Sequence, residues 1–151
     1  MKLVITRVAG ASVEINGEIY SEIKSGLLVL VGVTTTDTLK DVLYLAKKVS
    51  KLRIFPDDEG KLNRSCCDIG GEILAVSNFT LYADSSHGNR PSFIAAARPE
   101  LAEPLYNAFC EEVQKCGITV KTGVFGADMQ VSSVNDGPIT IVMESREKRE
   151  N

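Results

Sequence analysis

The sequence of 151 residues has no tryptophan, a single histidine and only four cysteines. No two cysteines are spaced as C-x-x-C, and one histidine with scattered cysteines supplies no closed set of zinc ligands. No G-x-G-x-x-G or Walker pattern follows any expected strand. We therefore expect no metal and no cofactor, and we interpret His87, in a Ser- and Gly-rich segment, as a solvated loop residue.

Long hydrophobic runs and an excess of positive charge are also missing. No segment approaches eighteen consecutive apolar residues, and residues 1–7 open no signal peptide, so we expect a cytoplasmic protein with no membrane contact. The net charge is −3 and the pI is about 5.2. This balance argues against bulk binding of nucleic acid, so we expect no DNA partner, yet it is compatible with contact to the end of an RNA.

The remaining composition is that of a globular domain, with 44% hydrophobic and 25% charged residues. A chain of this length buries roughly 68–70% of its unfolded surface, which allows a core without disulfides. We find no repeat and no linker, so residues 1–151 are expected to form one domain. The charged tail at about 146–151 is expected to fray.

Strand patterns dominate the chain. Residues 3–8 are β-prone, and Asn16-Gly17 predicts a type I′ hairpin that joins residues 12–15 to residues 18–23. The continuous apolar run at 27–33 predicts a buried central strand. Further strands are expected at 71–79, 118–122, 129–134 and 139–143.

Two helices are expected between these strands. Thr38 to Asp41 resembles a capping box at the start of the first helix. The second helix runs from about Pro99 to Cys116, and Pro104 predicts a late start or a kink. The expected buried faces are Leu39, Val42, Leu43, Ala46, Val49 and Leu52 in the first helix and Leu101, Leu105, Ala108, Phe109 and Val113 in the second.

These elements favour an α+β fold, in a layered ββα arrangement of mixed or antiparallel sheets with two main helices. Lys40, Lys47, Lys48 and Lys51 occupy the polar side of the first helix. They form either a solvated face or an RNA-binding patch, and the sequence leaves both interpretations open.

The first segment that could take part in binding or catalysis is Ser77-Asn78-Phe79-Thr80, where a buried strand ends in polar residues. Backbone N–H groups of Phe79 and Thr80 could face a ligand and stabilise an oxyanion. Alternatively, the hydroxyl groups satisfy local backbone groups at a strand end. Thr80 could be a nucleophile, but no base lies near it in the sequence.

The second segment is Asn135-Asp136-Gly137-Pro138-Ile139-Thr140. Gly137 can adopt backbone angles closed to other residues, and Pro138 fixes φ and removes a donor. Gly137-Pro138 is therefore either a turn at the start of a strand or a rigid wall of backbone carbonyls in a binding site.

The two segments together resemble signatures of the D-aminoacyl-tRNA deacylases, S-Q-F-T-L and N-x-G-P-V-T. The likeness extends across nearly the whole chain. It includes Arg7-Val8 with Ala11 to Val13, Gly26 to Leu30, Arg53 to Phe55, Arg90 to Phe93 and Thr122 to Met129.

The resemblance implies a homodimer with active sites at the subunit interface, which hydrolyses the ester between tRNA and a D-amino acid or glycine, including glycine mischarged on tRNA-Ala. Each subunit would insert a cis Gly137-Pro138 into the partner's pocket, where its carbonyls exclude an L side chain. Arg7 would hold this loop, while Phe125 and Met129 would line the site of the terminal adenosine.

The resemblance also implies chemistry assisted by the 2′-OH of the tRNA, so that the protein supplies positioning and the backbone donors of Phe79 and Thr80. Ser77, Asn78, Phe79 and Thr80 would then bind substrate together with Gly137 and Pro138. The expected partner is the acceptor end of tRNA, with Arg53, Arg64, Arg90 and the lysines of the first helix as candidates for phosphate contacts.

Asn78 departs from the family pattern, which has Gln at this position, so the amide is one methylene shorter. This departure leaves open a non-catalytic module that binds an RNA end or a protein. A third reading is a hydrolase for another ester that uses His87.

Overall fold

The computed structural model describes residues 1–145, so the tail at about 146–151, expected to fray, lies outside the described residues. Within them the chain forms eight strands, two α-helices and one 3-10 helix. In chain order these are β1 (Lys2–Ile15), β2 (Glu18–Ile23), β3 (Gly26–Gly32), α1 (Leu39–Ser50), β4 (Phe55–Pro56), β5 (Leu62–Arg64), β6 (Glu72–Ser77), η1 (Phe79–Tyr82), α2 (Pro99–Lys115), β7 (Thr119–Thr122) and β8 (Gln130–Glu144).

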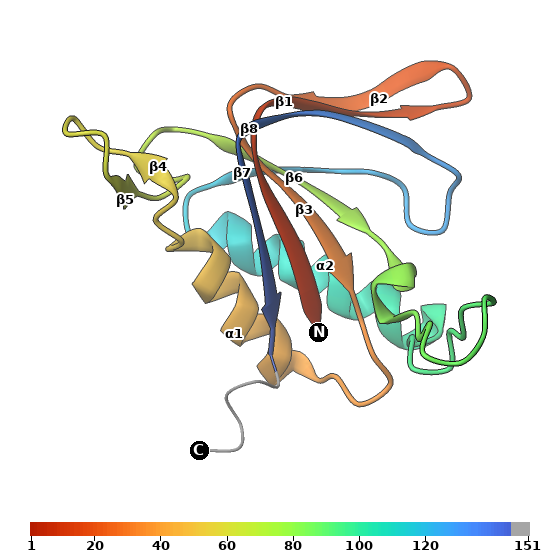
Figure 1. The fold of residues 1–151 in the computed structure, drawn as a ribbon. Helices are drawn as coiled ribbons and strands as arrows, with labels where there is room; N and C mark the ends of the chain where they lie inside the picture. The colour runs from red at the N-terminus through yellow and green to blue at the C-terminus, as the bar shows by residue number, and fades with distance from the viewer. Residues whose placement is uncertain (146–151) are drawn as a thin grey trace.

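The long strand β1 organises a mixed six-stranded sheet (Figure 1). The first half of β1 pairs with β3 and its second half pairs with β2, while β8 pairs with β1 along nearly its whole length. Strands β3, β6 and β7 are mutually parallel, and the pairings of β1 are antiparallel. Helices α1 and α2 pack together on one side of the sheet, and β4 and β5 form a separate hairpin.

Strand β1 contributes to two hydrophobic cores. Leu3 and Ile5 belong to the larger core, which includes the inward faces of α1 and α2. Val8 and Val13 belong to the second core, on the opposite side of the central strands. The pairing of β1 with β8 is irregular between Thr6 and Gly10, and such an irregularity reverses which side chains face inward. One strand therefore serves both cores and curls the sheet.

The strongest local signals in the sequence are confirmed. Asn16 and Gly17 adopt φ values of 52° and 80°, as a type I′ hairpin between β1 and β2 requires. Thr38 is the N-cap of α1, and its backbone N–H donates to the Asp41 carboxylate at 2.8 Å. The α+β class predicted from the element pattern is therefore confirmed.

The predicted helix faces are partly wrong. Leu39 and Leu43 are 53% and 45% exposed, whereas Leu45 is fully buried. The buried stripe of α1 is Val42, Leu45, Ala46 and Val49, which is a complete i, i+3, i+4, i+7 pattern. In α2, Leu101 is 37% exposed, and Ala102, Tyr106 and Cys110 are buried beside Phe109 and Val113.

Several predicted strand boundaries are also wrong, and the first is that residues 3–8 and 12–15 form one strand, β1. The segments 129–134 and 139–143 form one strand, β8, because β1 is long enough to pair with both and absorbs the irregularity between them. Strand β6 ends at Ser77, and Phe79 begins a 3-10 turn. Helix α2 begins at Pro99, as predicted, so the late start, one of the two effects expected of Pro104, does not occur, and Pro104 lies within the second turn. No helix within residues 1–145 is long and apolar enough to cross a membrane.

Candidate functional site

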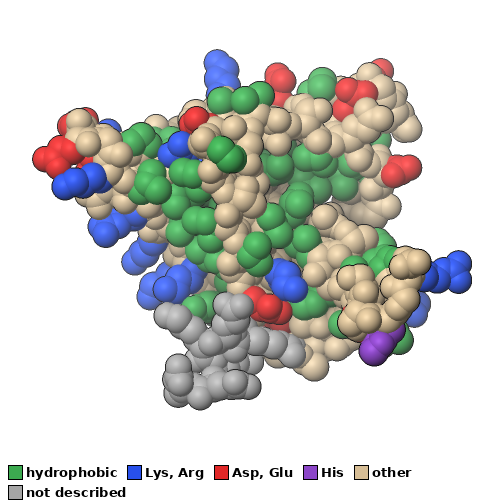
Figure 2. All heavy atoms as spheres, in the orientation of Figure 1, with side chains coloured by type: hydrophobic (Ala, Val, Ile, Leu, Met, Phe, Trp, Pro, Cys, Tyr) green, Lys and Arg blue, Asp and Glu red, His purple; other side chains and the backbone are tan. Residues whose placement is uncertain are grey.

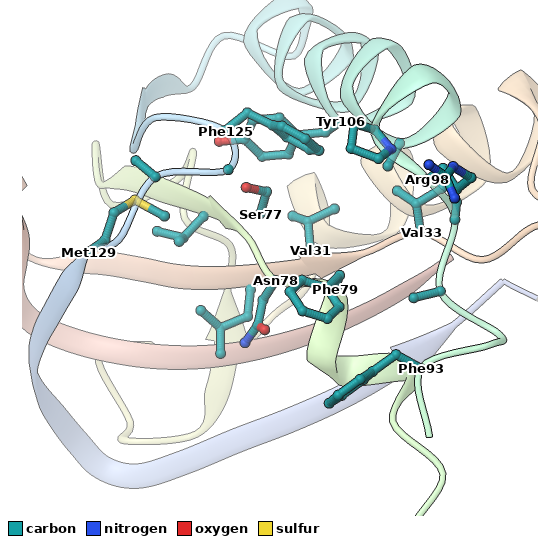
Figure 3. Close-up of a pocket in the computed structure, with 18 of the residues that line it drawn as sticks. Val31, Val33, Ser77, Asn78, Phe79, Phe93, Arg98, Tyr106, Phe125 and Met129 are labelled. Carbon is teal, nitrogen blue, oxygen red and sulfur yellow. The ribbon is translucent and has the colours of Figure 1, made fainter. Parts of the chain in front are cut away.

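A cavity of about 670 Å³ opens where β6 ends (Figure 3). Three parts of the chain form its walls: the ends of β3 and β6 with the turn that follows, the start of α2 with the segment before it, and the loop that leads into β8. The lining residues are Leu30, Val31, Val33, Val76, Ser77, Asn78, Phe79, Phe93, Ala96, Ala97, Arg98, Pro99, Ala102, Tyr106, Phe125, Gly126, Ala127, Asp128, Met129 and Val131.

Ser77 is the last residue of β6 and is paired with Val31 of β3. The parallel register continues one step further, because the Asn78 N–H donates to the Val31 carbonyl at 2.8 Å. The side chain of Ser77 points toward Phe125 across the cavity (Figure 3). The central strands therefore fix the position at which the chain turns away from the sheet and exposes backbone groups.

Asn78 caps the turn that follows. Its side-chain oxygen accepts hydrogen bonds from the Thr80 hydroxyl and from the Thr80 backbone N–H, the latter at 3.3 Å. This explains why a short amide fits at position 78, because an Asn side chain reaches the backbone two residues on. It also occupies the Thr80 N–H, one of the two donors expected to face a ligand.

The Phe79 N–H is the other of the two backbone donors, and Asn78 does not engage it. Among residues 1–145, it donates to no protein acceptor, and Phe79 itself is 57% exposed at the cavity. The Phe79 ring packs edge-on against Phe93, with 5.2 Å between ring centroids. Thr80 is exposed and does not line the cavity, and no hydrogen bond within the described residues joins it to His87.

Phe125 and Met129 line the same cavity from the loop before β8, and their contact with the terminal adenosine stays a prediction. Phe125 lies 6.1 Å from Tyr106, measured between ring centroids. The buried Tyr106 hydroxyl donates to the Ala75 carbonyl at 2.6 Å, and burial raises the pKa of Tyr106 well above its ordinary value. Tyr106 is therefore uncharged at neutral pH and forms part of the cavity wall, and its hydroxyl is hydrogen-bonded to β6.

The cavity offers little side-chain chemistry. Its ionisable groups are Arg98, Tyr106 and Asp128, and histidine, cysteine and lysine are absent from its lining. Within the described residues, no cluster of His, Cys, Asp or Glu could hold a metal ion. Besides its ionisable groups the cavity presents apolar surface and the Ser77 hydroxyl, and Phe79, whose N–H donates to no acceptor within residues 1–145, is part of its wall. These features suit positioning and oxyanion stabilisation.

The Gly137-Pro138 loop is a separate construction within β8. The peptide bond is cis, and Gly137 has a φ of 140°, which favours glycine. Arg7 holds the loop, because its Nε donates to the Asp136 carbonyl and its Nη1 donates to the Ile54 carbonyl, each at 2.9 Å.

Asn135 closes the loop from the other end. Its side-chain oxygen accepts from the Ile139 N–H at 3.0 Å, and its amide nitrogen donates to the Thr140 hydroxyl at 3.1 Å. Gly137 and Pro138 nevertheless remain exposed. The loop is thus fixed by its neighbours while its own backbone faces outward.

Within one chain, the Gly137-Pro138 loop does not reach the cavity. Paired residues on neighbouring strands show how far apart the two segments lie. Ser77 of β6 is paired with Val31 of β3, whereas Thr140 of β8 is level with Leu74 of β6, through Thr6 of β1 and Leu28 of β3. Three residues along β6 correspond to about 10 Å, and three strand spacings across the sheet add about 14 Å. The two signature segments therefore lie on different parts of the same subunit.

Sequence reasoning missed several residues of both constructions. Phe93, Arg98 and Tyr106 line the cavity. Phe93 lies in a segment that carries the family likeness but was given no role, and Arg98 and Tyr106 belong to no local motif. The bracing role of Asn135 had a signal, because Asn135 and Thr140 flank the Gly-Pro pair in the same signature. The Ile54 carbonyl had none, since only the fold brings it to Arg7.

The fold and the cavity define an α+β domain with a site built largely from backbone and apolar side chains. The family model described as D-Tyr-tRNA(Tyr) deacylase matches residues 4–144. A D-aminoacyl-tRNA deacylase of Chlorobaculum tepidum is 54% identical over 149 residues, covering 98% of this chain and 99% of the relative. That of Chloroflexus aurantiacus is 56% identical over 149 residues, covering 99% and 93%.

A solved structure of a c-Myc DNA unwinding element binding protein is similar with a TM-score of 0.89 and 43% identity, covering 95% of this chain and 98% of that one. The chain belongs to the D-Tyr-tRNA(Tyr) deacylase family. It is accordingly an enzyme of this class, an ester hydrolase. The DNA element in the name of the solved structure concerns that protein, and the expectation that this chain has no DNA partner stays a prediction.

Proposed function

We propose that this chain is a homodimeric editing hydrolase of the cytoplasm that cleaves the ester of D-aminoacyl-tRNA and spares the L form. One observation carries the proposal: a braced Gly137-Pro138 loop is exposed on β8, outside the cavity of its own chain. A second copy is needed to bring the loop and the cavity together, so each complete site lies between two subunits.

The exposed surface of β8 supports this arrangement. Strand β8 pairs only with β1 among the described residues, so its other edge is open over up to 15 residues. Val134 and Val142 are 64% and 61% exposed on it. Natural proteins cover or disrupt long edge strands, and a second copy is the cover that also delivers the loop.

The proposed selectivity is steric. The carbonyls next to Gly137 and Pro138 of one subunit would crowd the substrate Cα in the cavity of the other. An L side chain would clash with them, whereas a D side chain points away and glycine has nothing to clash. The same site therefore admits glycine, including glycine mischarged on tRNA-Ala.

The proposed chemistry uses the tRNA itself. Water attacks the ester carbonyl, the bond to the terminal ribose oxygen breaks, and the 2′-OH of that ribose assists the attack. The Phe79 N–H is the donor for the developing oxyanion, since Asn78 engages the Thr80 N–H. An ester is already activated, so no side-chain nucleophile is required, and the terminal adenosine lies against Phe125 and Met129.

The direct test is the release of amino acid from matched D-, L- and glycyl-tRNA. We expect release from the D and glycyl substrates only, and Pro138→Ala should increase hydrolysis of the L substrate. A Thr80→Ala variant that folds and dimerises should stay active. Loss of activity in that variant would replace the tRNA-assisted scheme with a threonine nucleophile.

Mixed dimers test whether the loop acts on the partner. One copy carries Ser77→Phe, which fills its cavity, and the other carries Pro138→Ala. If the loop acts in trans, the only open cavity faces an intact loop, and the mixed dimer hydrolyses the D form while sparing the L form. If the loop acts within its own chain, that cavity has the altered loop, and L hydrolysis appears.

A further inference from the structure

A second hollow, of about 520 Å³, lies between the end of α1 and β8. We call it the α1 groove. Figure 2 shows blue side chains gathered on the left of the molecule, over α1. The groove is lined by Tyr44, Lys47, Lys48, Lys51, Leu52, Arg53 and Met143.

The charge of the α1 groove is concentrated in a short segment, although Arg53 lies within electrostatic reach of Asp68. Residues 44–54 contain four cations and no acidic residue, in a chain with a net charge of −3. Lys47, Lys48, Lys51 and Arg53 are all exposed, and none of them forms an ion pair within residues 1–145. By contrast, Lys61, Arg64 and Lys115 each pair with a carboxylate within four ångströms.

Helical geometry places the three lysines on one side of α1. Lys47 and Lys51 are four residues apart and Lys48 and Lys51 are three apart, and both spacings make surface neighbours. Like charges at these spacings disfavour the isolated helix slightly. Lys47 and Lys48 lie in the last turn of α1, where the helix dipole stabilises positive charge and offsets part of this repulsion. Exposed Arg53 lies beyond the end of the helix and lacks this stabilisation. A polyanion would relieve the repulsion of all four cations.

The groove is joined to the Gly137-Pro138 loop by one side chain. Arg53 precedes Ile54, and the Ile54 carbonyl accepts a hydrogen bond from Arg7 at 2.9 Å. The same guanidinium donates to the Asp136 carbonyl, directly before Gly137. Arg53, at one end of the groove, is therefore adjacent in sequence to a contact that holds the loop, where the 3′ end of a tRNA is expected under the proposed function.

We propose that the α1 groove binds backbone phosphates of the tRNA acceptor stem. This inference rests on the proposed function, and it explains how an acidic protein holds a polyanionic substrate. The binding is sequence-independent, because lysine and arginine contacts to phosphate carry no base information. Lys40, on the same helix but outside the groove, takes no part.

The test measures binding of uncharged tRNA as a function of salt, so that it does not depend on hydrolysis. We expect a triple variant, Lys47→Gln, Lys48→Gln and Lys51→Gln, to weaken binding by at least about tenfold at low salt. It should also lower the slope of log K against log salt by about 3, or about one for each phosphate contact. Glutamine keeps the helix propensity, so folding should be retained.

Two controls separate location from charge. Lys24→Gln, Lys40→Gln and Lys115→Gln together change the net charge by the same amount at exposed positions outside the groove, and this variant should bind tRNA as the parent does. A triple Lys→Arg variant of the groove keeps the charge and should also bind. If the first control weakens tRNA binding as much as the groove variant does, the effect depends on net charge alone and the proposal is wrong.

The remaining outcomes also decide. Parental tRNA binding by the groove variant overturns the proposal, and so does a DNA duplex of the same length that binds the groove more tightly than tRNA. Deacylation by the parent is measured separately. If the parent binds tRNA through the groove but releases no D-amino acid, the proposed function is wrong and the proposed phosphate binding is retained. If the parent releases D-amino acid while the groove variant binds tRNA normally, only the proposed phosphate binding is wrong.

Discussion

Replacing Arg7 with methionine tests how the Gly137-Pro138 loop is held. The Arg7 side chain is 11% exposed and makes two hydrogen bonds to backbone carbonyls, each at 2.9 Å. Hydrogen bonds from a charged donor contribute about 1.5–3 kcal/mol each. The exposed Asp136 can turn to water, but Ile54 is 5% exposed, so its carbonyl would be left buried at a cost of about 1–3 kcal/mol.

We therefore expect Arg7→Met to lower the free energy of unfolding by about 2–4 kcal/mol, measured in urea at a fixed protein concentration. The protein should remain folded, since domains have about 5–15 kcal/mol of stability. Hydrolysis of L-aminoacyl-tRNA should rise relative to the D form, because the backbone before Gly137 loses its anchor.

Arg64→Met is the matched control. Its guanidinium is 43% exposed and pairs with the exposed Asp58 at 2.9 Å, and such surface pairs contribute only about 0–1 kcal/mol. The D to L ratio should be unchanged in this variant. If Arg7→Met costs no more than Arg64→Met and keeps the parental D to L ratio, then Arg7 does not hold the loop and the reasoning is wrong.

Three further predictions follow from single contacts. Asn78→Ala should destabilise the turn at the cavity by about 1 kcal/mol and reduce turnover of D-aminoacyl-tRNA, whereas Asn78→Asp keeps the acceptor and should retain both. Gly26→Ala places a Cβ 1.9 Å from the Glu72 carbonyl oxygen, so urea unfolding should show a loss of about 3 kcal/mol or more, while Gly10→Ala, with its nearest atom at 3.5 Å, should lose less than about 1 kcal/mol. A thiol reagent at pH 8 should modify exposed Cys67 and Cys116 quickly; the two buried thiols, whose pKa burial raises to about 12 and about 11, should react only on unfolding, and rapid reaction of all four would contradict the fold.

Local chemistry explains what could be predicted from the sequence. Asn16-Gly17 specifies its hairpin because its two residues must adopt positive φ, and Thr38 with Asp41 specifies the start of α1 through hydrogen bonds three residues apart. The order of the strands needs more than these signals. It depends on β1 pairing along both edges, which no window of the sequence shows.

The errors have a common physical origin in tertiary contacts. Leu39 and Leu43 fit a helical stripe as well as Leu45 does, and only the position of the sheet and α2 decides which residues are buried. Residues 135–138 look like a break between two strands because of Gly137 and Pro138. They continue β8 because Asn135 braces the loop from within and Arg7, far away in the sequence, braces it from β1.

The same origin limits what can be predicted of the site. The groups proposed to act are backbone groups, the Phe79 N–H and the carbonyls around Gly137 and Pro138, and every residue has such groups. What distinguishes them is how they are held: Asn78 engages the competing donor, and Arg7 fixes the loop. A search of the sequence for nucleophiles and bases does not find side chains that only position the backbone. Such side chains are identified from a family signature or from the fold.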